Sequence, residues 1–551
     1  MATIHELNDQ ALELQKDKQF ADAEAIFQQV LGRDPVNRVA LFGVAYCRDM
    51  QGDRAGAKRG YGEAIAKDPW LLEAAINLAN LEEMDNNIED SIRLTQEALK
   101  VSPSNPKLWS LLAARLVIGK RFDEANSAFQ KAMGYAPKDT KILLQYYFFL
   151  LSIGRAAETQ PLIDAAVSAN PNDLGVLQAA GEIAQQTGRL QDAVNYYTRI
   201  LKIDPFNPDA CMNLAMILDV SGRREEAKQI RSRGLSRSRV FKQKFPSSAR
   251  SHKILVLEAP EGGMSSGNLF PDEHYEKTRL ILEPGLKKLP DELGQFDLVV
   301  NGLCEIDHPL QAEAAAMVAL LGRVCLNAPV LGERRGRCDL EYLVGGIERL
   351  STIPVRRVPS ALLMSEAVPA WVRPVAMPYI ANWVLIPDAQ TLAAVAQQLG
   401  CDWFDYTPIP AIQGSDGLTR VIRATAIGGE IRPYRLLASH LPCIDPSGQL
   451  VAQEAWLAAE EKELIETADK FLPPIMGQAL YRFVQRLNLD LAVIDFVYDS
   501  HRLLVLDVMP YPVFLSKLQA PHLEHQASAD RALFQSINRL VESKLAKAVT
   551  S

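Results

Sequence analysis

Two acidic residues lie inside apolar segments near the C-terminal end of the chain. The stretch VIDFVYDSHRLLVLDVMPYP, residues 493–512, predicts two strands around a polar turn, with Asp495 and Asp507 among Val, Ile, Leu and Phe. A carboxylate in such surroundings is costly unless it reaches solvent or a cation compensates it. In a hairpin that turns near residue 500, the two carboxylates lie nearly opposite each other. A shared Mg²⁺ ion would take their oxygens as ligands and relieve their repulsion.

Arginines supply an alternative partner for these acids. Between Lys288 and Lys462 the chain has no lysine, and arginines stand at 337, 373, 420, 423, 432 and 435, among other positions. A guanidinium is always charged and binds a carboxylate or a phosphate through paired N–H groups. An aspartate on a strand beside an arginine often forms only an ion pair, so the metal site and the structural ion pair both remain open.

The elements that must position these residues alternate between strand and helix patterns. KILVLEA (253–259), FDLVVNGL (296–303) and VCLNAPV (324–330) read as buried strands, with a helix predicted from about 309 to 322. This alternation predicts a parallel sheet with helices on its faces.

Five stretches of the C-terminal half follow one another in a familiar order. They are LNAP (326–329), RGRCDLEYLVGGIERLSTIPVRRVPS (335–360), AWVRPVA (370–376), GLTRVIRATAIGGEIRPYRLLASH (417–440) and the acidic hairpin itself. In this order they resemble the ATP-grasp ligases, in particular the branch of the ribosomal-protein glutamate ligase and glutathione synthetase.

The resemblance implies ATP and Mg²⁺ as cofactors and a carboxylate-amine ligase reaction. In that family, magnesium bridges the ATP phosphates while the terminal phosphoryl group moves to a carboxylate, and an amine then attacks the acyl phosphate. Adenine would meet residues 402–410. The implied metal ligands are Asp495 and Asp507, the nucleotide-binding residues are Arg337, Arg373, Arg420 and Arg423, and the catalytic residues are Arg423 and Arg435, which would face the same anions.

The chain departs from that family at the residues that would do the chemistry. Asp507 stands where the family has Glu, and Met509 replaces an Asn, which removes a hard oxygen ligand. No glycine occurs between Gly346 and Gly400, and MPYIANWVL (377–385) occupies the place of the glycine-rich lid. The lost lid and Met509 favour a ligase-like domain that has lost catalysis, whereas the two retained acids and the arginines favour a working ligase.

The N-terminal 240 residues carry an internal repeat. Prolines recur every 34 residues, at 35, 69, 103, 137, 171 and 205. In the same frame lie small residues at 45, 79, 113, 181 and 215 and at 23, 57, 91, 125, 193 and 227, with aromatics at 27, 61 and 129. Small residues let two helices approach closely, and proline stops the second helix. The pattern resembles the tetratricopeptide repeat, with six units and a seventh helical pair at 208–236.

The repeat resemblance implies a concave surface that binds a peptide or a partner protein. The alternative is an array that only scaffolds the rest of the chain or its oligomer, and the sequence leaves the oligomeric state open.

Composition limits the classes of function. The 551 residues carry a net charge of -8, which argues against binding to DNA or to an anionic membrane. The start MATIHELNDQ lacks the apolar core of a signal peptide, and no run of about 18 apolar residues occurs. The seven cysteines form no CxxC pair. We therefore expect a cytoplasmic protein with reduced thiols.

Together these patterns predict a multidomain chain, an all-α tetratricopeptide-repeat solenoid followed by an α/β (α+β) ATP-grasp-like domain. The expected boundaries are 1–240 for the solenoid, 241–250 for a linker, 251–335 for an α/β pre-ATP-grasp-like domain and 336–545 for the ATP-grasp-like domain.

The expected function is an ATP- and Mg-dependent ligase acting on a peptide or protein recruited by the repeats. The alternative is a catalytically degraded scaffold or ligand-binding protein. A glycosyltransferase is a third hypothesis, for which CEIDHPL (304–310) is a poor acidic motif.

The repeats should fold alone, because each unit packs mainly against its neighbours. We expect a fragment of residues 1–240 to be helical and to melt cooperatively when followed by circular dichroism. A disordered spectrum would contradict this prediction.

Overall fold

The computed structural model describes two compact units, Met1–Asp204 and Pro205–Ser551, and each is treated by itself. The described residues are 2–550 apart from 156–157, 243–251, 263–268, 271–274, 304, 307, 330, 332–335, 376–382, 400, 411, 446, 468–470, 499–500 and 512–522. Parts of the predicted linker, lid and hairpin turn, namely 243–250, 377–382 and 499–500, therefore lie outside the described residues.

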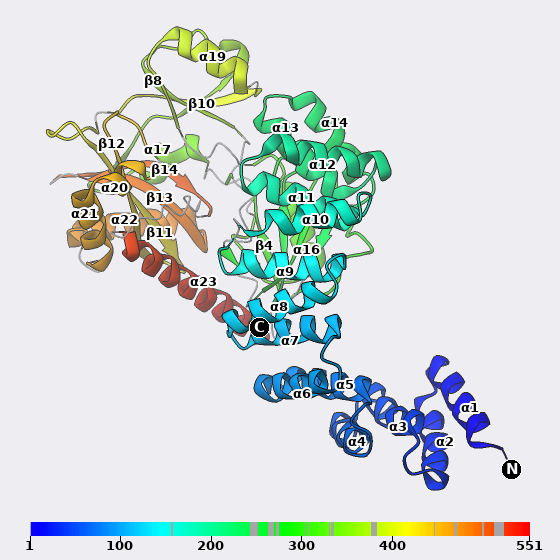
Figure 1. Ribbon diagram of the computed structural model, residues 1–551. Coiled ribbons are helices and arrows are strands. Elements are labelled where there is room, and N and C mark those ends of the chain that lie inside the picture. Colours follow the sequence, from blue (N-terminus) through cyan, green and yellow to red (C-terminus); the bar gives the residue numbers. More distant parts are fainter. Residues whose placement is uncertain are drawn as a thin grey trace. The chain divides into compact units, whose positions relative to one another are not determined.

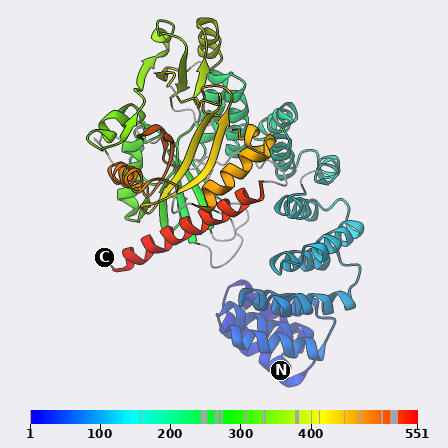
Figure 2. The ribbon, with the colours of Figure 1, turned by 90° about the vertical axis from the view of Figure 1, so that its left-hand side faces the viewer.

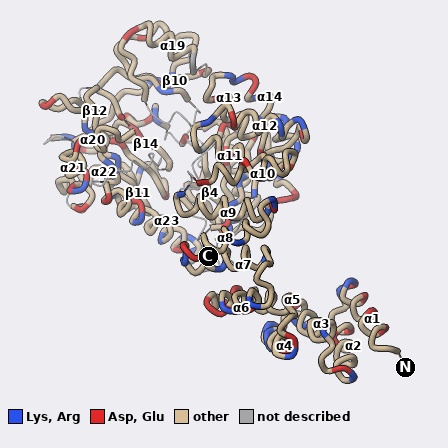
Figure 3. The backbone as a smooth tube through the Cα atoms, in the orientation of Figure 1, with Lys and Arg blue, Asp and Glu red and all other residues tan. Residues whose placement is uncertain are grey.

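The first unit is a run of antiparallel helix pairs (Figure 1), along which acidic and basic residues are interspersed (Figure 3). The helices are α1 (Ile4–Lys16), α2 (Phe20–Arg33), α3 (Arg38–Met50), α4 (Arg54–Lys67), α5 (Leu72–Met84), α6 (Ile88–Val101), α7 (Pro106–Ile118), α8 (Phe122–Tyr135), α9 (Thr140–Ser152), α10 (Gln160–Ala169), α11 (Leu174–Gln186) and α12 (Leu190–Ile203).

The repeat positions lie where the sequence pattern predicts them. The small residues Ala45 and Ala79 and the aromatic Phe27 and Tyr61 have no exposed surface. Gly181 shows why size matters there, since a Cβ on it would lie 2.5 Å from the ring of Tyr197. The ring of Tyr197 thus fills the space that Gly181 leaves open, and the prediction that small residues let the two helices of a unit approach closely is confirmed.

The third unit breaks this pattern and compensates for it. Thr95 occupies the position of the aromatic, and the buried guanidinium of Arg115 donates to the Thr95 hydroxyl over 2.5 Å. Arg115 also donates to Asn80 over 2.6 Å and to Glu83 over 3.3 Å. Burial lowers the pKa of Arg115, and Glu83 opposes that shift. A polar network therefore replaces an apolar contact between α5, α6 and α7.

The second unit opens with two more helices and a five-stranded sheet. The helices α13 (Pro208–Val220) and α14 (Arg224–Leu235) form the predicted seventh pair. The sheet has the order β1-β3-β2-β4-β5, and its strands are β1 (Val240–Lys242), β2 (His252–Glu258), β3 (Tyr275–Ile281), β4 (Leu298–Asn301) and β5 (Cys325–Leu326). Every pairing is parallel except that of β1 with β3, and α16 (Gln311–Leu321) lies between β4 and β5 in sequence.

The predicted parallel sheet is thus observed, with two differences at its edge. β3 carries four polar or charged residues within YEKTRLI, so its apolar pattern is too weak to identify it from sequence. Val240–Lys242 pairs with β3, so this strand includes the first two residues of the linker predicted at 241–250. A short strand can be recruited by an open sheet edge whatever its own composition.

Two further sheets complete the second unit. The four-stranded sheet has the order β7-β10-β8-β9, with β7 (Arg356–Pro359), β8 (Ala370–Pro374), β9 (Val384–Ile386) and β10 (Trp403–Pro408). The other has the order β12-β11-β13-β14-β6, with β6 (Leu350–Thr352), β11 (Thr419–Ile427), β12 (Glu430–Ser439), β13 (Leu491–Tyr498) and β14 (Leu503–Met509). The hairpin predicted within 493–512 is confirmed by the antiparallel pairing of β13 with β14, and the stretch 417–440 forms a second hairpin, in which β11 pairs antiparallel with β12.

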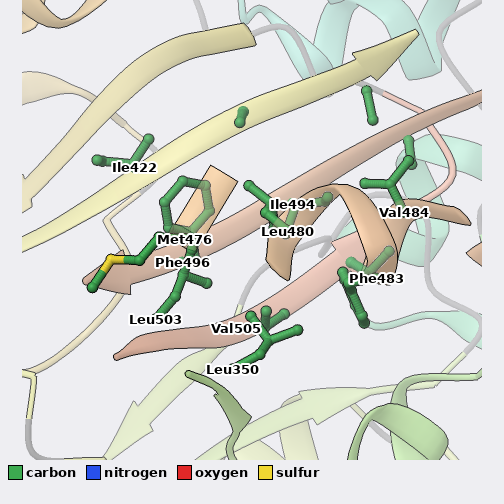
Figure 4. Close-up of a cluster of buried hydrophobic side chains, with 14 of the residues drawn as sticks. Leu350, Ile422, Met476, Leu480, Phe483, Val484, Ile494, Phe496, Leu503 and Val505 are labelled. Atoms are coloured by element: carbon green, nitrogen blue, oxygen red, sulfur yellow. The ribbon is translucent and has the colours of Figure 1, made fainter. Parts of the chain in front are cut away.

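Helices cover these two sheets. They are α17 (Leu340–Val344), α18 (Ser360–Leu363), α19 (Ala389–Leu399), α20 (Gln449–Gln453), α21 (Ala455–Glu466), α22 (Pro474–Leu487) and α23 (Glu524–Thr550), with a 3₁₀ turn, η2, at Arg337–Asp339. Figure 4 shows α22 against β13 and β14, with Met476, Leu480, Phe483 and Val484 near Ile494, Phe496 and Val505.

The long helix α23 joins the apolar cores of the first and third sheets. Its residues Ala529, Leu533, Ile537 and Val541 recur every four positions and so form one stripe. The stripe belongs to one buried cluster with residues of β2, β4, β11, β12 and β13. Figure 2 shows α23, in red, running beside β11 and β12, which form one of the two hairpins.

Asn327, in the LNAP stretch, links the same two sheets through hydrogen bonds. Its side-chain amide donates to the carbonyls of Leu491 and Pro510, both over 2.8 Å, and its side-chain oxygen accepts from the Leu491 N–H over 3.0 Å. Its backbone has a positive φ of 51°, which Asn tolerates better than most residues. This buried amide thus satisfies the backbone N–H and C=O of Leu491 and the C=O of Pro510.

We expect Asn327→Ala to lower the free energy of unfolding by about 2–4 kcal/mol, because it leaves buried backbone donors and acceptors without hydrogen-bond partners. Asn327→Gly is the companion variant, since glycine relieves the positive-φ strain and still removes the amide. Urea denaturation of the full chain measures both. Recovery of full stability by the Gly variant would mean that strain, not hydrogen bonding, explains the loss.

Candidate functional site

The two acids of the C-terminal hairpin lie opposite each other. Asp495 on β13 and Asp507 on β14 are register partners, and both are almost fully buried. On the other side of β13, Arg423 of β11 is the register partner of Asp495. The register expected from the sequence is confirmed, and the two carboxylates are adjacent within one sheet.

Asp495 forms a paired interaction with Arg423. Nε of Arg423 donates to Oδ1 over 2.8 Å, and Nη2 donates to Oδ2 over 2.7 Å. Burial disfavours the charged guanidinium, but Asp495 outweighs burial and raises the pKa of Arg423. Both oxygens of Asp495 therefore already accept from a cation.

Asp507 is held by two other arginines. Arg337 of η2 donates from Nε to Oδ1 over 2.6 Å, and Arg373 of β8 donates from Nη1 to Oδ2 over 3.0 Å. The backbone N–H of Val508 also donates to Oδ1, over 2.8 Å. As with Asp495, each carboxylate oxygen has a donor.

Two further acids complete what we call the ionic cluster, which comprises Glu305, Arg337, Arg373, Asp405 and Asp507. Glu305 accepts from Arg337 over 3.0 Å and from Arg373 over 3.3 Å. Asp405, on β10, accepts from Arg337 over 3.2 Å and from Arg357 of β7 over 2.9 Å. With the half-buried Arg357 included, three carboxylates meet three guanidinium groups, so the formal charges balance.

The electrostatics favour the ionised forms of Glu305 and Arg337. Burial opposes ionisation of Glu305, but Arg337 and Arg373 outweigh it and hold the pKa of Glu305 below its ordinary value. Burial would likewise lower the pKa of Arg337, but the carboxylates around it raise it well above its ordinary value. Charge compensation therefore exceeds the desolvation of these groups.

The other predicted site residues lie elsewhere. Arg420 pairs with Asp416 over 2.8 Å and with Glu460 over 3.0 Å, outside the ionic cluster. Arg435 donates to Asp530 of α23 over 2.6 Å, and its guanidinium lies 4.0 Å from the Tyr434 ring centroid. The structure thus brings Arg337 and Arg373 together at Asp507, places Arg423 at Asp495, and gives Arg420 and Arg435 partners of their own.

Sequence reasoning did not identify Glu305 or Asp405 as members of the site. Asp405 lies in WFDYTP, between aromatic residues of a strand, so the criterion that singled out Asp495 and Asp507 would have found it. Glu305 lies outside the described strands and helices and offers no comparable signal.

The arrangement fits ion pairs better than a divalent cation. Every oxygen of Asp495 and Asp507 accepts from an arginine, so Mg²⁺ could coordinate them only after displacing a guanidinium. In the part of the chain that the structure describes, no three His, Cys, Asp or Glu side chains are grouped to hold a metal. Magnesium binding by this pair stays a prediction.

Comparison with known proteins identifies the repeats. Residues 8–69 and 51–240 match two family models, each described as tetratricopeptide repeat. The first 240 residues or so are thus a tetratricopeptide repeat array, built of helices α1 to α14, and a mixed α/β region follows. Among the described residues, no helix is long and apolar enough to span a membrane.

The chain is similar to parts of several curated proteins. It is 25% identical to human Protein O-mannosyl-transferase TMTC1 over 176 residues, which is 31% of this chain and 20% of that protein. It is 26% identical to human Tetratricopeptide repeat protein 7B over 240 residues, 40% of this chain and 27% of that protein. It is 30% identical to TPR repeat-containing protein YpiA of Bacillus subtilis (strain 168) over 101 residues, 18% and 24% of the two chains.

Two solved structures are each similar to part of this chain. YrrB, described as a TPR protein with an unusual peptide-binding site, is 21% identical, and the match covers 33% of this chain and 94% of that one with a TM-score of 0.28. The type IV pilus biogenesis factor PilW is 16% identical, with coverage of 38% and 96% and a TM-score of 0.32.

The ion-pair arrangement predicts a sign for one substitution. Asp495→Asn keeps shape and polarity but leaves Arg423 buried without its counter-charge, so it should lower the free energy of unfolding in EDTA by about 3 kcal/mol. Asp416→Asn is the matched control, because its partner Arg420 has a side chain 27% exposed. That change should cost less than about 1 kcal/mol.

Urea denaturation of both variants measures these losses. If Asp495→Asn left the metal-free protein as stable as before and weakened a magnesium-dependent binding of ATP, Asp495 would be a metal ligand instead.

Proposed function

We propose that the chain is a protein-interaction scaffold whose repeat array binds a peptide or partner protein. The observation that carries this proposal is the full pairing of Asp495 and Asp507 with arginines. That pairing supports an α/β region held together by balanced charge. The repeat array, in contrast, is an architecture whose stacked helices leave extended surfaces for a partner.

The array also contains a groove of suitable size. Helices α6, α7 and α8 line a cavity of about 420 Å³, and its apolar residues include Leu99, Leu112 and Leu116. Ligand pockets commonly measure about 300–1,000 Å³ and combine an apolar lining with a few polar groups. A short peptide segment is therefore a suitable occupant.

One observation favours the ATP- and Mg²⁺-dependent carboxylate-amine ligase as a second candidate. Nη1 of Arg423 and Nε of Arg373 are buried and have no hydrogen-bond acceptor among the described residues. Two unused cationic donors beside Asp495 and Asp507 are groups that a phosphate oxygen could accept from. In this second proposal Arg337, Arg373, Arg420 and Arg423 bind ATP, and Arg423 and Arg435 act on the transferred group.

A peptide-display selection against the full chain separates the two candidates. For a scaffold, we expect the selection to enrich peptides that bind equally well in EDTA and in Mg·ATP, and we expect calorimetry to detect no binding of Mg·ATP. Selection of no peptide, together with magnesium-dependent binding of ATP, would overturn the scaffold proposal and support the ligase.

A further inference from the structure

The groove between α6 and α8 combines apolar and cationic groups in one place. Its lining residues fall on one face of each helix, at spacings of three, four or seven. The floor comprises the buried side chains of Leu99, Leu112, Leu116 and Ala128. The indole of Trp109 forms one wall and is fixed by a 2.7 Å hydrogen bond from its Nε1 to the carbonyl of Pro103.

Two lysines give the rim of this groove a positive charge. Nζ of Lys131 lies 4.3 Å from the centroid of the Trp109 ring, an arrangement in which the ring attracts the ammonium group. Lys100 is exposed on α6 and forms no ion pair among the described residues. Both ammonium groups are therefore open to an incoming anion.

The one acid in the lining does not cancel this charge. Glu124 accepts two hydrogen bonds from Arg121, over 2.7 and 2.8 Å, and Arg121 holds the pKa of Glu124 below its ordinary value. Arg121 also pairs with Glu89 over 3.1 Å, but the lining itself holds two lysines and one acid, so its net charge is positive.

The groove belongs to this place in the array and not to every unit. With a repeat of 34 residues, positions 109 − 34 and 109 + 34 hold Ala75 and Leu143, so no neighbouring unit offers the indole. Positions 131 − 34 and 131 + 34 hold Glu97 and Ala165, so neither offers the ammonium group beside it. The combination arises from residues that depart from the repeat pattern.

We infer that this groove binds an acidic peptide segment in which an apolar side chain is flanked by carboxylates. The apolar side chain would occupy the floor beside Trp109, and the carboxylates would pair with Lys100 and Lys131. The amide of Gln96, also on the rim, has no partner among the described residues and would bond the peptide backbone. This inference rests on the proposed scaffold function and names its partner class.

The test uses the full chain and an array of octapeptides. One set places Leu, Ile or Phe between Asp and Glu residues, a second set replaces the acids with Lys, and a third replaces the apolar residues with Ser. Fluorescence polarisation should show binding of the first set alone, and binding should weaken as salt rises because paired charges are screened.

Charge reversal locates the binding to this groove. We expect Lys100→Glu combined with Lys131→Glu to weaken binding of the acidic peptides by about tenfold or more. The matched control combines Lys141→Glu with Lys202→Glu, two exposed lysines outside the groove, and should leave the affinity unchanged. Trp109→Leu gives the position the side chain found in the next unit and should also weaken binding while preserving helicity.

The outcomes distinguish this inference from the function on which it rests. If peptides bind but prefer Lys-flanked sequences, or if the groove variants bind as well as the control, the inference is overturned and the scaffold function stands. If no peptide of the display selection or the array binds, the scaffold function itself is overturned.

Discussion

The second unit depends on the compensation of buried carboxylates by guanidinium groups. Removing an ion from water costs several kcal/mol even after the protein relaxes, and a buried pair recovers this only with good geometry. Asp507 reaches that geometry by contacting η2 and β8, two elements far from it in sequence. Each element that supplies a charge is thereby fixed in place, because a shift of one would leave its partner uncompensated.

The ionic cluster therefore determines how two sheets meet. Arg373 and Asp405 lie on the four-stranded sheet, while Asp507 lies on the sheet that contains both hairpins. Apolar packing would tolerate small displacements between such sheets, since it is not directional. Paired hydrogen bonds between planar groups do not tolerate such displacements. The cluster therefore contributes more to the relative orientation of the two sheets than to net stability.

The first unit is built from a repeat, and the residues that depart from the repeat pattern make its units differ from one another. Where the repeat pattern holds, as at Ala45 and Tyr61, each helix pair packs as its neighbours do. Thr95 and Arg115 replace an aromatic contact by a buried network, and Trp109 with Lys131 creates a groove that neighbouring units lack. The residues that follow the repeat pattern determine how the helices pack. The residues that depart from it supply the polar and charged groups that a partner could contact.

The sequence predicted the local geometry well and the distant partners poorly. The prolines and small residues located the helix pairs, and the hairpin placed Asp495 opposite Asp507, because both depend on neighbours within a few tens of residues. The contact of Arg337 with Asp507 spans 170 residues and depends on how strands are ordered in the sheets. Periodicity shows that a side chain is buried but does not name the strand that will face it. For the same reason Glu305 and Asp405 did not stand out as partners of those arginines.

The charges also decide how the two proposed functions compare. For Asp495 and Asp507 to take up Mg²⁺, Arg337, Arg373 and Arg423 would each have to give up a carboxylate. Arg337 and Arg373 would keep Glu305 as a partner, whereas Arg423 would lose the carboxylate with which it pairs, and a buried charge left without its partner costs on the order of 3 kcal/mol. An ATP phosphate could compensate part of this, since it would accept from the freed guanidinium groups. The unused donors at Arg373 and Arg423 are the natural place for such an anion, yet two N–H groups offset only about 1–3 kcal/mol each. The paired state already gives every oxygen of Asp495 and Asp507 an arginine donor, whereas metal binding would have to break these pairings. The balance favours the paired state and, with it, the scaffold.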